Sequence, residues 1–98
     1  MLYAFVADYN PNTSEAQRDA ALVRRATWKP NAGATIKSEH WSFGNSPLIY
    51  TVFEADDPKA LWQMLADWSD VLDVRIFPVI TAEFGLANGQ EIFSKRAR

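Results

Sequence analysis

The sequence predicts a single α+β domain of the ferredoxin-like type, an antiparallel sheet with two helices on one face. Three observations predict it. The chain has 98 residues, which is enough for one domain with a modest core and too few for two. Strand-like and helix-like segments follow each other in the order β-α-β-β-α-β within about eighty residues, which is the order of that fold. Strong chain breakers, among them Pro11, Pro30 and Pro58, lie between these segments.

The first half of the chain predicts a strand, a helix and a second strand. Residues 2–9 are rich in aromatic and β-branched side chains, which favour a strand. The helix is expected to begin from a cap at residues 12–13 and to end near Trp28, because Pro30 disfavours helical geometry in the residue before it. The second strand is expected over residues 34–41, after a glycine.

The second half repeats the pattern in the order strand, helix, strand. Residues 48–55 are apolar on both sides and predict a strand. Asp57 is well suited to cap a helix over residues 58–70 that begins with a proline. The last strand is expected over residues 71–80. Because Pro78 has no N–H to donate, its part of that strand should lie at an edge, at a bulge or at the strand's end.

The C-terminal part of the chain is expected to lie outside this fold. We place the ferredoxin-like domain at residues 1–82 and a C-terminal extension at residues 83–98. In the extension, Asn88-Gly89 is a turn signal, residues 91–93 favour a short extra strand, and residues 95–98 form a basic tail.

Composition excludes several classes of function. Ten Lys and Arg against twelve Asp and Glu give a net charge of −2, so nothing in the charge favours nucleic acid. No apolar run reaches the ~18 residues of a membrane span and no secretory signal is recognisable, so we expect a cytoplasmic protein without a membrane partner. Without cysteine and with one histidine, the chain lacks the ligands of common zinc sites, and no glycine-rich nucleotide loop occurs. We therefore expect no metal and no cofactor.

The alternation of side chains along the strands predicts what each face of the sheet does. We expect the aliphatic set, such as Leu2, Val6 and Val52, to face the helices. The other set would lie on the face that the helices leave uncovered: Tyr3, Phe5, Ile49, Thr51, Phe53, Asp73, Arg75 and Phe77, together with Lys37, Glu39 and Trp41. So much aromatic area is costly to expose in a monomer. We therefore predict a homodimer in which this sheet face meets its own copy.

Several short motifs resemble a small bacterial family of unknown function of the dimeric α+β barrel type. The motifs are Met1-Leu2-Tyr3, Trp41, Phe53 to Pro58, Leu61, Trp68, Asp70 and Phe77-Pro78-Val79, and the resemblance covers residues 1–82. It implies the same fold and a homodimer. Proteins of this architecture include cofactor-free oxygenases, isomerases of the muconolactone type and haem-degrading enzymes. The haem-degrading type carries its catalytic histidine on a helix, whereas the only histidine here lies in a predicted strand.

Candidate site residues follow from the predicted sheet face. A small organic ligand would lie between the sheet and the helices or near the dimer interface, and its expected binding residues are Tyr3, Phe5, Trp41, Thr51, Phe53, Arg75 and Phe77. The candidates for handling protons are His40, Tyr9 and Glu54. Structural roles compete with these assignments, since Arg75 is also placed to pair with Asp73 or with Glu39.

Three classes of function remain open. The first is a dimeric small-molecule-binding domain, the second a cofactor-free monooxygenase or isomerase, and the third a structural or protein-interaction module. An apolar cavity of a few hundred Å³ with an inward polar group would favour binding or catalysis. A sheet interface without such a cavity would favour the structural or protein-interaction module.

Overall fold

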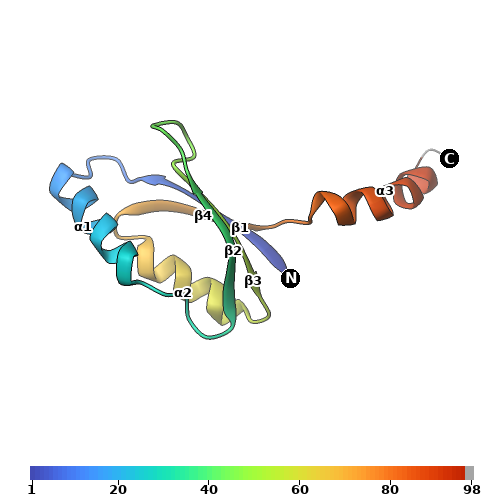
Figure 1. Ribbon diagram of the computed structural model, residues 1–98, viewed down its shortest axis with the longest axis horizontal. Coiled ribbons are helices and arrows are strands. Elements are labelled where there is room, and N and C mark those ends of the chain that lie inside the picture. Colours follow the sequence, from blue (N-terminus) through green and yellow to red (C-terminus); the bar gives the residue numbers. More distant parts are fainter. Residues whose placement is uncertain (97–98) are drawn as a thin grey trace.

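Four strands form one antiparallel sheet in the order β2-β3-β1-β4 in the computed structural model, which describes residues 1–96 (Figure 1). The strands are β1 (Leu2–Tyr9), β2 (Ala34–Trp41), β3 (Ile49–Ala55) and β4 (Leu72–Pro78). β1 pairs with β3 on one side and with β4 on the other, so β2 and β4 are the edge strands. Pro78 is the last residue of an edge strand, as its missing N–H predicts.

Two helices cover one face of the sheet, α1 (Glu15–Thr27) and α2 (Pro58–Trp68) (Figure 1). Asp57 caps α2 through its carboxylate, which accepts from the Lys59 amide at 2.9 Å, as predicted. The predicted cap of α1 is wrong: Ser14 caps that helix and forms a capping box with Gln17. Asn12 is unsuited to the role because its φ of 66° is left-handed rather than extended. The resulting order β-α-β-β-α-β-α is α+β and close to the ferredoxin-like fold.

The prediction of which side chains face the helices is wrong for β1, for β3 and for part of β2. Directly paired residues of an antiparallel ladder share a face. Phe5 pairs with Ile76 of β4 and with Thr51 of β3, so the aliphatic residues of β4 and the aromatic residues of β1 lie together. The residues of the predicted uncovered set that face the helices instead are Tyr3, Phe5, Ile49, Thr51, Phe53, Glu39 and Trp41. Only Lys37, Asp73, Arg75 and Phe77 lie on the other face as expected.

Two of the buried helix residues are alanines, which leaves room for aromatic side chains of the sheet. Ala21 of α1 and Ala60 of α2 contribute little volume to the core, which leaves space above the sheet. Phe5 and Phe53 fill that space, and Phe53 is 0% exposed. Tyr3 stacks on Phe53 with ring centroids 5.8 Å apart. These rings pack with Met64 and Trp68, the large buried residues of α2, and with the small Ala21 and Ala60.

The opposite side of the sheet has no helix over it and is called here the open face (Figure 1). Its centre is an apolar stripe along β1, β3 and β4, formed by Leu2, Ala4, Val6, Tyr50, Val52 and Phe77. Charged side chains flank the stripe, including the ion pair between Lys37 and Glu54 at 3.4 Å. The open face is thus less aromatic than predicted, but it is still apolar at its centre.

A third helix, α3 (Ala82–Arg96), follows β4 and projects beyond the sheet (Figure 1). It replaces the turn and short strand that we predicted for residues 88–93. Thr81 starts the helix, since its hydroxyl accepts from the Phe84 amide at 3.0 Å. The last two residues of the predicted basic tail, 97–98, lie outside the described residues. None of the helices in residues 1–96 is long and apolar enough to cross a membrane.

Candidate functional site

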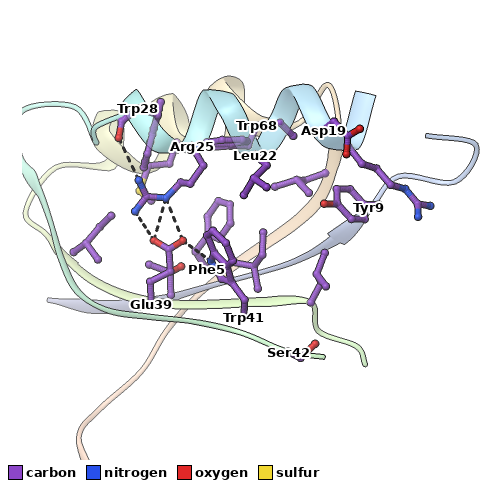
Figure 2. Close-up of a pocket in the computed structure, with 18 residues that line it drawn as sticks. Phe5, Tyr9, Asp19, Leu22, Arg25, Trp28, Glu39, Trp41, Ser42 and Trp68 are labelled. Carbon is purple, nitrogen blue, oxygen red and sulfur yellow. Dashed lines mark hydrogen bonds and ion pairs between the residues drawn. The ribbon is translucent and has the colours of Figure 1, made fainter. Parts of the chain in front are cut away.

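A cavity of about 290 Å³ lies between α1 and the sheet, next to the end of β1 (Figure 2). Tyr9 stands at one end, and Arg25 and Glu39 stand at the other. Leu22 of α1 and Trp41 of β2 lie at the rim, because both line the cavity and both are more than half exposed. The cavity therefore has a buried floor and an opening to solvent.

Aromatic side chains form most of the apolar wall. Phe5 lies on the floor, and Trp28 and Trp68 close the side of the helices, with ring centroids 5.5 Å apart in an edge-to-face contact. The Trp28 indole N–H is already used, because it donates to the Asp67 carboxylate at 3.0 Å. Arg18 covers the Tyr9 ring, with its guanidinium carbon 4.8 Å from the ring centroid. Arg24 lies over the Trp68 ring at 5.0 Å and Arg25 over the Trp28 ring at 5.5 Å, so a guanidinium covers one face of each of these rings as well.

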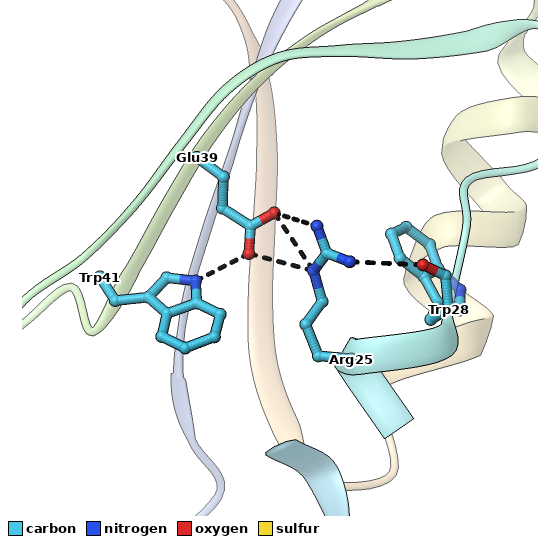
Figure 3. Close-up of polar contacts among 4 residues, drawn as sticks. All are labelled: Arg25, Trp28, Glu39 and Trp41. Atoms are coloured by element: carbon cyan, nitrogen blue, oxygen red, sulfur yellow. Dashed lines mark hydrogen bonds and ion pairs between the residues drawn. The ribbon is translucent and has the colours of Figure 1, made fainter. Parts of the chain in front are cut away.

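An ion pair between a helix and the sheet crosses one end of the cavity (Figure 3). Arg25 Nη2 lies 2.6 Å from Glu39 Oε1, and Arg25 Nε donates to both carboxylate oxygens at 3.1 and 3.2 Å. The Trp41 indole N–H also donates to Glu39, at 2.7 Å. Arg25 Nη1 reaches the carbonyl of Trp28 at 3.3 Å. The carboxylate is thereby fixed between a cation and an indole, with its side chain only 16% exposed.

These contacts decide the charge state of Glu39. Burial by itself raises the pKa of the carboxyl, but the hydrogen bonds from Arg25 and Trp41 outweigh it and hold the pKa below its ordinary value. The same contact with Glu39 raises the pKa of Arg25 further above its ordinary value, against the effect of burial. Both groups are therefore charged at neutral pH.

A bulge in β2 brings Glu39 into the cavity. The pairing of β2 with β3 shifts between Ile36 and Ser38, so one additional residue enters the strand. After the shift, Glu39 and Trp41 fall on the same face as Ile36, beneath α1. Arg25 meets them because it lies in the last turn of α1.

The structure brings together four of the predicted site residues. Phe5, Tyr9, Trp41 and Thr51 line the cavity. Thr51 is buried and has no hydrogen bond from its side chain to any residue in the described chain, so its hydroxyl is available at the cavity wall. Tyr3 and Phe53 belong to the adjacent core and lie outside the cavity lining.

The other four predicted residues do not join this cavity. His40 pairs with Tyr50, Glu54 pairs with Leu2 and with Thr35, and Arg75 pairs with Val6, so each lies on the open face, as does Phe77. Arg75 forms no ion pair with any residue in the part of the chain described. Glu39, which we considered as its partner, is bound to Arg25.

Sequence reasoning missed Arg25 and Trp28 as cavity residues and placed Glu39 on the wrong face. One signal was present in the sequence. Ile36 and Trp41 are five positions apart, so these two apolar residues of one strand fall on opposite faces unless the alternation shifts between them. Arg25 carried no comparable signal, because a basic residue in the last turn of a helix is ordinary.

The described residues contain no group of three or more His, Asp or Glu side chains placed to hold a metal ion. The cavity lining offers aromatic rings, the hydroxyls of Tyr9, Ser42 and Thr51, and the charged side chains of Arg18, Asp19, Arg25 and Glu39.

A comparison with known protein families assigns this chain to a family. A family described as a domain of unknown function (DUF3303) matches residues 1–93, so the chain belongs to that family. The match extends through most of α3. Neither the comparison with curated proteins nor that with solved structures found a match.

Proposed function

We propose that this protein is a small-molecule-binding domain whose ligand occupies the cavity between α1 and the sheet. One observation carries the proposal: the cavity combines an aromatic wall with an inward, charged ion pair at one end. Its volume of about 290 Å³ lies near the lower limit of ~300 Å³ for small-molecule sites. A compact ligand is therefore expected.

The lining defines the chemical class of this ligand. The aromatic side chains of Trp28, Trp68 and Phe5 in the cavity wall favour a planar or alicyclic apolar body. Glu39 is ionised and accepts hydrogen bonds only, so a ligand N–H or O–H group would share its oxygens with Arg25 and Trp41. We infer a compact, mostly apolar molecule, aromatic or alicyclic, with one hydrogen-bond donor directed at Glu39.

Catalysis by a cofactor-free oxygenase or isomerase has less support than binding. Of the residues considered for moving protons, Tyr9 lines the cavity, while His40 and Glu54 lie on the open face. Glu39 is present but is a weak base, because its contacts lower its pKa. A purely structural module also has less support, since an internal cavity of about 290 Å³ does not contribute to stability or to a protein contact.

We also propose that the chain forms a homodimer of the dimeric α+β barrel type through its open face. The order of elements and the apolar stripe of the open face support this. The aromatic side chains of the sheet give no such support, because most of those rings face the helices. The cytoplasmic location stays a prediction.

Filling the cavity is expected to abolish ligand binding. Leu22 lines the cavity and Val23 does not, although the two are neighbours on the exposed side of α1. Leu22→Trp should therefore occupy the cavity, while Val23→Trp adds the same bulk elsewhere. We expect indole to bind the natural protein with a Kd of about 1 mM, as for a fragment, and benzofuran, which lacks the N–H, to bind more weakly. Protein-observed NMR titration measures both.

The expected pattern is binding of indole by the natural chain and by Val23→Trp, with loss in Leu22→Trp. Equal binding by Leu22→Trp and Val23→Trp would place the ligand elsewhere. Equal affinity for indole and benzofuran would mean that Glu39 does not accept a hydrogen bond from the ligand N–H.

The homodimer has its own test. Analytical ultracentrifugation at micromolar concentration should give twice the 11.1 kDa of one chain. Phe77→Glu on the open face should reduce this to the mass of a monomer, whereas Phe43→Glu, in the loop after β2, should not. A natural chain that sediments as a monomer contradicts the proposal.

A further inference from the structure

Thr51 is a polar residue on an apolar face of its strand. The residues of β3 that face the helices are Ile49, Thr51, Phe53 and Ala55. Valine has the same branched shape and suits a strand equally well, so packing at this position does not need the hydroxyl. Thr51 is only 4% exposed. A buried hydroxyl without a hydrogen bond lowers stability, so a threonine here calls for a partner.

The partner of this hydroxyl lies outside residues 1–96. The Thr51 side chain forms no hydrogen bond with any of them. In the same residues, no side-chain N or O atom is both sealed from solvent and without a hydrogen bond, so the Thr51 oxygen reaches open space. That space is the cavity, which Thr51 lines. A molecule in the cavity can therefore supply the hydrogen bond.

Thr51 stands between Phe5 and Glu39 on the floor of the cavity. It pairs with Phe5 of β1 on one side and with Glu39 of β2 on the other, so the three side chains form a row across the sheet. Directly paired residues have Cβ atoms about 4.5–5.5 Å apart. The Thr51 hydroxyl is therefore a neighbour of the Glu39 carboxylate.

Glu39 has room for one further donor. Three N–H groups donate to it, namely Nε and Nη2 of Arg25 and the indole N–H of Trp41, and Arg25 Nε divides its bond between the two oxygens. A carboxylate offers about four lone-pair sites, so a ligand N–H brings the donors to the number that the group accommodates. A carboxylate cannot donate, however, so a ligand acceptor beside that N–H needs a different group.

Thr51 is the hydroxyl placed to serve such an acceptor. The cavity lining contains three hydroxyls. That of Ser42 donates to the carbonyl of Asn45, and Tyr9 stands at the opposite end of the cavity from Glu39 (Figure 2). Only the hydroxyl of Thr51 lies directly beside Glu39 and has a free proton to donate.

We propose that the ligand is a compact cyclic amide, a lactam, whose N–H is directed at Glu39 and whose carbonyl oxygen accepts from the Thr51 hydroxyl. The inference rests on the proposed function, because it assigns a second contact to the same ligand. A ring holds the N–H and the C=O of an amide on one edge, whereas an open-chain amide is trans and directs them to opposite sides. Adjacent donor and acceptor on the ligand thus match the adjacent carboxylate and hydroxyl on the sheet.

Indole and oxindole test the second contact. They share a bicyclic skeleton and an N–H, but only oxindole has a carbonyl beside that N–H. We expect the natural chain to bind oxindole about tenfold more tightly than indole, which corresponds to one hydrogen bond. Thr51→Val should remove this preference and leave the Kd of indole within about twofold, while Thr51→Ser, which keeps the hydroxyl, should retain it. Protein-observed NMR titration measures each Kd.

Thr35→Val is the matched control. Thr35 pairs with Glu54 on the open face and does not line the cavity, so the same substitution there should change neither Kd. Urea unfolding supplies a readout that a structural role of Thr51 would move. Thr51→Val should not lower the urea midpoint, because the hydroxyl that it removes has no protein partner to leave unsatisfied. A lower midpoint would mean that the hydroxyl stabilises the fold and would overturn the inference.

The outcomes separate this inference from the proposed function. Indole binding that Leu22→Trp abolishes, together with equal affinity of the natural chain for indole and oxindole, would keep the binding cavity and overturn the lactam. An equal loss of both compounds in Thr51→Val would overturn the role of the hydroxyl. A preference for oxindole that Tyr9→Phe abolishes and Thr51→Val does not would place the acceptor at the other end and overturn the inference. A natural chain that binds neither compound would overturn both proposals.

Discussion

Phe53→Ala is expected to lower the free energy of unfolding by about 4 kcal/mol. Phe53 is 0% exposed, and Tyr3 stacks on its ring within the core between the sheet and the helices. Removing the ring leaves a cavity that its neighbours on β1 and α2 cannot fill without moving backbone. Urea unfolding followed by tryptophan fluorescence measures the difference, provided that the transition is two-state.

Phe77→Ala is the matched comparison. Both residues are phenylalanines in strands of the same sheet, but Phe77 lies on the open face and is 41% exposed. We expect a loss of about 1 kcal/mol in dilute protein, because much of that ring already contacts water. A larger loss for Phe77→Ala than for Phe53→Ala would mean that the helices cover the opposite face of the sheet.

Phe53 and Phe77 were both predicted on the uncovered face of the sheet, and only Phe77 lies there. The order of the elements was predictable, because each helix and strand has its own period, cap or breaker. The choice of face was not, because β1 is apolar in both alternating sets, Leu2-Ala4-Val6 and Tyr3-Phe5-Ala7. Hydrophobicity does not separate two apolar sets. The separation comes from the register with β4, a long-range property in which Phe5 meets Ile76.

The C-terminal helix shows a second limit. Gly85 and Gly89 weaken a helix, and Asn88-Gly89 is a common turn signal, so local propensity favours a break where α3 is continuous. The cap at Thr81 was the positive signal for the helix, with an acidic residue, Glu83, in its first turn. Local signals of about 1 kcal/mol each therefore oppose one another in this segment and did not decide between a helix and a break.

The candidate site could be predicted in part. Phe5, Tyr9, Trp41 and Thr51 were predicted as site residues and line the cavity. The ion pair was not predictable as a pair, because it joins α1 to β2 through a bulge that local sequence does not specify. Only the pairing of β2 with β3 shows that Glu39 lies on the side of the sheet that faces the cavity.

Glu39→Gln is expected to lower the free energy of unfolding by about 2 kcal/mol at pH 7. The substitution keeps the shape of the side chain but removes the charge that faces Arg25, which is 31% exposed and would remain as a partly buried cation. The Trp41 indole would also lose a charged acceptor. Asp70→Asn is the control, since Asp70 pairs with the neighbouring Arg24 at 2.9 Å on the surface and its loss should cost less than about 1 kcal/mol.

The same variant isolates a pH dependence. Because contacts in the folded protein hold the pKa of Glu39 below its ordinary value, the folded state binds the carboxyl proton less readily than the unfolded state. The stability from this group is complete above the unfolded pKa of ~4.3 and is lost as the pH falls through the lower folded pKa. The difference in unfolding free energy between the natural chain and Glu39→Gln should therefore be constant from pH 7 to about pH 5 and shrink below pH ~4. A difference that stayed constant into that acidic range would mean that Glu39 is not stabilised as a carboxylate by Arg25.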